Sequence, residues 1–151
     1  MKAGERLFCD TNVLLSAVDQ RRPLHRHALH VFNTLPNRGV ELCVSGQVLR
    51  EFLVVSTRPA EANGLGMEPA AAVENVAAFV SRSTLLDETS DVSTRLARIV
   101  STSGCSGKQI HDANIAATLL AHGLTQLVTS DPDDMRRFDG VDVVPLGGVL
   151  G

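Results

Sequence analysis

The chain alternates short apolar runs with longer stretches in which apolar residues recur every three or four positions. Continuous short runs are typical of strands buried on both faces, and the longer pattern is typical of amphipathic helices. The short runs predict strands at 7–9, 40–44, 84–86, 126–129 and 141–144. Because helical patterns separate these runs, we expect an α/β fold with an open parallel sheet.

The helical patterns also carry recognisable end signals. Thr11 and Asn12 are favourable N-cap residues for the first helix, and Ser45 is favourable for a later one. Further helices are expected at about 25–35, 46–57, 69–82, 89–103 and 110–123, with a short one after Asp131. The segments 58–67 and 101–107 are rich in Gly, Pro or Ser and are expected to be loops.

Length and composition favour one globular domain over residues 1–151. No apolar stretch approaches the length of about 20 residues that crosses a membrane, and Asp10 interrupts the first apolar run too early for a secretory signal. We therefore expect a cytoplasmic protein. Its three cysteines are far apart and indicate neither a disulfide framework nor a zinc site.

The formal net charge of −3 gives no sign of a polyanionic partner. That balance becomes slightly positive if four acids are set aside as metal ligands. All but two of the 14 basic residues are Arg, which binds phosphate in a bidentate manner. The composition thus permits a nucleic-acid partner without requiring one.

Four separate acids occupy positions where a carboxylate has a possible chemical role. Asp10 and Asp131 each follow a predicted buried strand, where ligands usually bind in open α/β sheets. Glu51 takes a place in the apolar stripe of its helix, and Asp112 lies in the first turn of another. Three of them also have a simpler interpretation: Asp10 caps a helix, Glu51 reaches solvent, and Asp112 stabilises the helix dipole.

If the four carboxylates meet at one edge of the sheet, their mutual repulsion calls for a counter-charge. An all-oxygen ligand set suits a hard divalent ion, Mg²⁺ or Mn²⁺. Such an ion activates water and stabilises charge on a phosphoryl group. The arrangement therefore predicts metal-dependent phosphoryl chemistry.

Four segments in order carry a family resemblance: Cys-Asp-Thr-Asn-Val-Leu-Leu at 9–15, Val-Leu-Arg-Glu-Phe at 48–52, Ile-His-Asp-Ala-Asn-Ile-Ala-Ala at 110–117 and Val-Thr-Ser-Asp at 128–131. With them the chain resembles a PIN-domain ribonuclease, in particular the toxin of a VapBC-type toxin-antitoxin pair. The resemblance implies a three-layer α/β/α fold with a five-stranded parallel sheet in the order 3-2-1-4-5.

The resemblance also implies a function and a set of residues. It implies metal-dependent cleavage of RNA, with tRNA or rRNA as expected substrates, leaving a 5′-phosphate. It further implies a homodimer that a small antitoxin protein inhibits. The acids that match the family's catalytic and metal-binding positions are Asp10, Glu51, Asp112 and Asp131, with Asn12 and Thr129 in support. Asp133 and Asp134 are candidates for an additional metal contact or for solvated acids at a helix start.

Contacts to RNA are suggested by the basic cluster around Arg21, Arg22 and Arg26, although ordinary solvated charges explain it equally. The spacing of His25, His27 and His30 does not favour a metal site. The loops 58–67 and 101–107 are candidate contacts for RNA or antitoxin.

Three other functions stay open at this point. A haloacid-dehalogenase-like phosphotransfer protein would need a second Asp two positions after Asp10, where Asn12 stands. A response-regulator receiver would need an acidic pair ahead of Asp10. A PIN-like module that only binds would be expected to lack at least one of the four acids.

Overall fold

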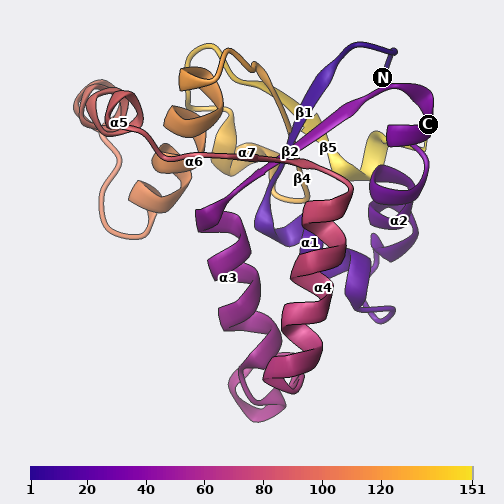
Figure 1. Ribbon diagram of the computed structural model, residues 1–151. Helices are drawn as coiled ribbons and strands as arrows, with labels where there is room; N and C mark the ends of the chain where they lie inside the picture. Colours follow the sequence, from indigo (N-terminus) through magenta and orange to yellow (C-terminus); the bar gives the residue numbers. More distant parts are fainter. Residues whose placement is uncertain (151) are drawn as a thin grey trace.

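The computed structural model describes residues 1–150 and has a five-stranded parallel sheet at its centre (Figure 1). The strands lie in the order β3-β2-β1-β4-β5. Their bounds are β1 (Arg6–Cys9), β2 (Glu41–Ser45), β3 (Thr84–Leu86), β4 (Gln126–Thr129) and β5 (Asp142–Pro145). The predicted strands and their order are confirmed.

The described residues also form seven α-helices. They are α1 (Thr11–Val18), α2 (His25–Asn33), α3 (Gly46–Thr57), α4 (Pro69–Ser81), α5 (Ser90–Ser103), α6 (Gln109–Ala121) and α7 (Pro132–Met135). Right-handed crossovers place α1 to α4 over one face of the sheet and α5 to α7 over the other, in agreement with their contacts (Figure 1). In this part of the chain, no helix combines the length and hydropathy needed to cross a bilayer.

The central strands form the core of the molecule. Leu7, Phe8 and Cys9 have no exposed surface, as expected of a strand covered on both faces. On α6, Ala113 and Ala116 are also fully buried, so this helix approaches the sheet closely. The carboxyl ends of β1 and β4, which are neighbours, are thereby held in fixed positions.

Two predicted helix ends differ from the structure, and one predicted loop is shorter than expected. Asp10, rather than Thr11 or Asn12, is the N-cap of α1. Its backbone is extended, and its carboxylate accepts a hydrogen bond from the first amide of the helix, that of Thr11. Helix α2 ends at Asn33 instead of 35, where the Leu35 amide bonds to the carbonyl five residues earlier. The predicted end of the fifth long helix at 103 is confirmed, so within the segment 101–107 that was expected to be a loop only residues 104–107 lie outside α5.

Candidate active site at the carboxyl ends of β1 and β4

Asp10 lies at the carboxyl end of β1 and is only 8% exposed. Its Oδ1 accepts a hydrogen bond from the Thr11 amide (2.8 Å), and its Oδ2 accepts one from the Thr129 hydroxyl (2.8 Å). Its own amide donates to the carbonyl of Val128 on β4. The helix-capping interpretation of Asp10 is therefore correct, and one carboxylate oxygen still faces β4.

The environment of Asp10 disfavours its negative charge. Burial raises the pKa of this carboxyl to about 6, against the hydrogen bonds from Thr129 and Thr11, which lower it. The charges of Asp112 and Glu51 raise the pKa further. Three of the four predicted acids therefore lie within electrostatic reach of one another.

Glu51 points from α3 toward the start of α1. Its Oε2 accepts a hydrogen bond from the Thr11 hydroxyl (2.8 Å), and its Oε1 accepts one from Gln47 Nε2 (2.9 Å). Both donors are buried, with Thr11 8% and Gln47 2% exposed. Glu51 is thus held in place by two side chains and is only partly exposed.

Gln47 also connects α3 to α6. Its Nε2 donates to the carbonyl of His111 (2.8 Å), and its Oε1 accepts a hydrogen bond from Asn114 Nδ2 (2.7 Å). The Asn114 amide also donates to Glu88 in the segment before α5. These contacts fix the first turn of α6 beside Glu51. The sequence analysis did not predict a role for Gln47, Asn114 or Glu88. The one available signal was the position of Gln47, one turn before Glu51 on the same face of α3, where it can bond to that carboxylate.

Asp112 lies half-buried in that first turn of α6. Burial raises the pKa of its carboxyl, and the charges of Asp134 and Glu51 act in the same direction. The nearby charges of Arg137 and His111 oppose this shift without cancelling it. Asp134 of α7 is therefore electrostatically part of the cluster.

Asp131 joins the cluster through two uncharged side chains. Its Oδ2 accepts a hydrogen bond from Asn12 Nδ2 (3.2 Å), and its amide donates to the Thr129 hydroxyl oxygen (3.1 Å). Asn12 Nδ2 lies 3.0 Å from the same hydroxyl oxygen, and Asn12 Oδ1 accepts from the Ser130 amide (3.0 Å). Asn12 and Thr129 thus link the ends of β1 and β4 and orient the exposed Asp131 relative to Asp10.

The sequence from residue 7 to residue 141 matches the PIN domain family. The chain belongs to this family. A comparison with curated protein sequences gave no significant match. Membership in the PIN family speaks against the receiver and haloacid-dehalogenase alternatives and agrees with the strand order.

Solved structures with the same fold include chains of toxin-antitoxin complexes. A chain of the VapBC2 complex from Rickettsia felis aligns with a TM-score of 0.68 at 18% identity, covering 93% of this chain and 98% of that one. A chain of the DNA-bound VapBC complex from Salmonella typhimurium gives 0.67 at 19%, covering 94% and 98%. VapC20 from Mycobacterium tuberculosis, described as a sarcin-ricin loop cleaving toxin, gives 0.67 at 18%, covering 89% and 98%. At these identities the likeness establishes the fold alone.

PIN nucleases typically use Mg²⁺, and the acids of this PIN domain suit that ion in charge and donor type. Among the described residues, no ion pair involves Asp10, Glu51, Asp112 or Asp131. Arg137 and His111 act on Asp112 from a distance, but no cation of the described residues is paired directly with any of the four carboxylates. As the side chains of residues 1–150 are placed, however, no three His, Cys, Asp or Glu side chains are close enough to hold an ion.

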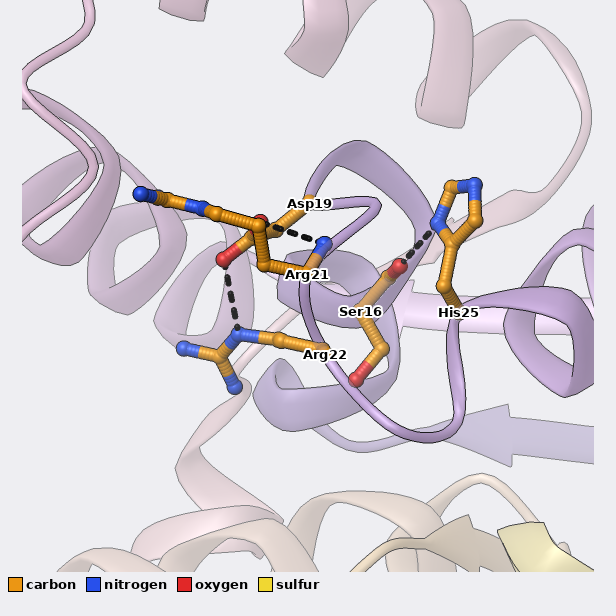
Figure 2. A network of polar contacts seen from close by, with 5 residues as sticks. All are labelled: Ser16, Asp19, Arg21, Arg22 and His25. Carbon is orange, nitrogen blue, oxygen red and sulfur yellow. Dashed lines mark hydrogen bonds and ion pairs between the residues drawn. The ribbon is translucent and has the colours of Figure 1, made fainter.

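The predicted basic cluster lies at the opposite end of α1 from Asp10. Arg21 Nε is 3.1 Å from Asp19 Oδ1, and Arg22 Nε is 3.6 Å from Asp19 Oδ2 (Figure 2). Partial burial acts to raise the pKa of Asp19, but the hydrogen bonds and charges of Arg21 and Arg22 bring it below its usual value. The nearby His25 Nδ1 lies 2.7 Å from the Ser16 carbonyl (Figure 2).

Two of the three predicted RNA-binding arginines are therefore engaged by one aspartate. The third, Arg26, is exposed on α2 and is in no ion pair of the described residues. A contact of this cluster with RNA stays a prediction.

Proposed function

We propose that this PIN domain is a metal-dependent endoribonuclease and the toxin of a toxin-antitoxin pair. The observation that carries the proposal is the group of acids Asp10, Glu51, Asp112 and Asp131 at one edge of a PIN fold, with no protein cation paired to them among residues 1–150. We expect a structured RNA as the substrate, either tRNA or rRNA. Support for that class comes from the likeness to VapC20, whose structure is described as that of a sarcin-ricin loop cleaving toxin.

In this proposal the four acids hold Mg²⁺ or Mn²⁺. When bound, the ion lowers the pKa of a coordinated water and stabilises the charge that develops on the scissile phosphate. Thr129 and the Thr11 amide orient the two oxygens of Asp10. Thr11 and Gln47 hold the two oxygens of Glu51, and Asn12 positions Asp131. Hydrolysis by activated water would leave a 5′-phosphate on the downstream product.

The proposed partners follow from the same neighbours. The similar chains from Rickettsia felis and Salmonella typhimurium were crystallised as VapBC complexes, and another similar chain comes from the FitAcB structure of Neisseria gonorrhoeae. We propose that this chain likewise forms a complex with an antitoxin and, on the family resemblance alone, that it is a homodimer.

Incubation of the purified protein with tRNA and rRNA, with Mg²⁺ or with EDTA, tests the nuclease directly. We expect discrete fragments with ligatable 5′-phosphates in Mg²⁺ only, and no fragments from Asp10→Asn. Asp91→Asn, which removes an acid from the surface of α5, is the matched control and should cleave normally. RNA that is bound but left intact in every condition would instead favour a PIN module that only binds.

A further inference from the structure

A surface cavity of about 380 Å³ lies directly beside Glu51, on the exposed side of α3. Arg50 and Val54 line it along the helix, and Arg58 lines it at the helix end. Thr11, whose hydroxyl donates to Glu51, forms part of the same wall. The cavity is therefore continuous with the carboxylate cluster. Its volume falls in the range of about 300–1,000 Å³ that is usual for ligand pockets.

The two arginines of this cavity are available to bind an external anion. Arg50 and Arg58 are exposed, and neither belongs to an ion pair within residues 1–150. Glu51, the carboxylate nearest to them in the lining, already accepts a hydrogen bond on each oxygen. This distinguishes the α3 arginines from Arg21 and Arg22, which share Asp19.

The wall between the arginines is apolar. Val54 is 51% exposed and is one of few large hydrophobic side chains left open to solvent in the described chain. Two cations flanking an apolar surface match a nucleotide, which has anionic phosphates and a flat apolar base or sugar. Arginine can also stack on a base through its guanidinium plane, so a site of this type needs no aromatic residue.

We propose that this cavity binds the RNA strand next to the scissile phosphate. Arg50 and Arg58 bind backbone phosphates, and Val54 packs against the intervening nucleoside. This inference rests on the proposed nuclease function and adds the direction in which the strand leaves the carboxylates, along α3. Because phosphate contacts carry no sequence information, the cavity positions RNA without selecting its sequence.

Binding of a fluorescent oligouridylate, measured by anisotropy in EDTA over a range of salt concentrations, tests the proposal without any cleavage. The Arg50→Ala/Arg58→Ala double variant should bind more weakly. The slope of log K against log salt should decrease in magnitude by about 1.4, at about 0.7 for each lost phosphate contact in a single strand. Arg98→Ala removes an exposed, unpaired α5 arginine outside the cavity and should leave the slope unchanged.

Val54 provides a second, independent variant. Val54→Glu places a negative charge between the arginines at an exposed helical position that should tolerate it, and it should weaken binding. Val54→Gln, of similar size but neutral, should weaken it much less.

A double variant that binds like wild type, or no more weakly than Arg98→Ala, would overturn the proposal. So would an oligoglutamate peptide that binds through Arg50 and Arg58 while oligouridylate does not, since the cavity would then accept an acidic protein segment. Cleavage of RNA with unchanged binding by the double variant would reject this cavity and leave the nuclease intact. Binding that depends on the two arginines, without any cleavage, would support the cavity and reject the nuclease.

Discussion

The carboxylate of Asp10 has two roles: it caps a helix, and it belongs to a group of negatively charged side chains. Its Oδ1 caps α1, and its environment raises its pKa to about 6. The usual pKa of an Asp in an unfolded chain is about 3.9. Between these values the folded protein binds more protons than the unfolded one, so its stability falls as the pH rises through this window.

This linkage gives a prediction for Asp10→Asn in EDTA. At pH 8 the variant should be more stable than wild type by about 1–3 kcal/mol, since a shift of two pKa units corresponds to at most about 3 kcal/mol. At pH 5 the difference should shrink, because Asp10 is then largely protonated in the folded state. Urea denaturation at the two pH values measures both differences. A wild type that is the more stable protein at pH 8 would contradict the raised pKa.

Gln47 is one of two uncharged residues that hold Glu51, and it also connects α3 to α6. Replacing the buried Gln47 with Leu removes one hydrogen-bond partner from each of Glu51, Asn114 and the His111 carbonyl, in contacts that are partly buried. We expect a loss of about 1–3 kcal/mol in stability and reduced RNA cleavage. Gln20→Leu, in an exposed turn, should change neither. Equal stability of the two variants would show that the network contributes nothing.

At the scale of elements, α1 supplies a test that separates the two roles of Asp10. Asparagine keeps an oxygen that accepts from the Thr11 amide, whereas alanine removes the cap. Asp10→Ala should therefore unfold more easily than Asp10→Asn by about 1 kcal/mol, while both lose RNA cleavage. Thermal melting of the two variants in EDTA gives the comparison. Identical melting would mean that the cap does not stabilise α1.

The elements themselves could be predicted from the sequence because their patterns are strong. The continuous apolar run at 7–9 identified a fully buried strand, and the resemblance supplied the strand order. The end of α1 was less predictable, since Asp10, Thr11 and Asn12 are all good capping residues and only the backbone shows which of them precedes the helix. Helix α2 ends two residues before the predicted position because the Leu35 amide donates a hydrogen bond to the His30 carbonyl, which the sequence pattern does not reveal.

Over the whole molecule, the proximity of Asp10 and Asp131 could be predicted, while the side-chain contacts around the acids could not. Asp10 and Asp131 follow strands that become neighbours, so topology alone brings them near each other. The contacts of Gln47, Asn114 and Glu88 join three segments whose spacing only the folded chain defines. Polar residues look like surface positions in a sequence, and only the place of Gln47 one turn before Glu51 hinted at one of these hydrogen bonds.

The arginines that line the α3 cavity could not be predicted from the sequence either. Arg50 and Arg58 lie outside the densest basic segment of the sequence. That segment contains Arg21, Arg22 and Arg26, for which RNA contacts were predicted. Whether a cation is free depends on neighbours such as Asp19, which the structure identifies. Charge density along the chain was therefore a poor guide to charge available at the surface.

The central claim is that acids distant in the sequence share one hard divalent ion. The most direct test is thermal unfolding of the metal-free protein during titration with Mg²⁺. Wild type should gain stability by about 2.7 kcal/mol at a Mg²⁺ concentration of 100 times the Kd, since the ion binds the folded state. Asp10→Asn and Asp112→Asn should gain little, and Asp91→Asn should respond like wild type. A wild type that does not respond to Mg²⁺, or variants that respond equally, would contradict the account.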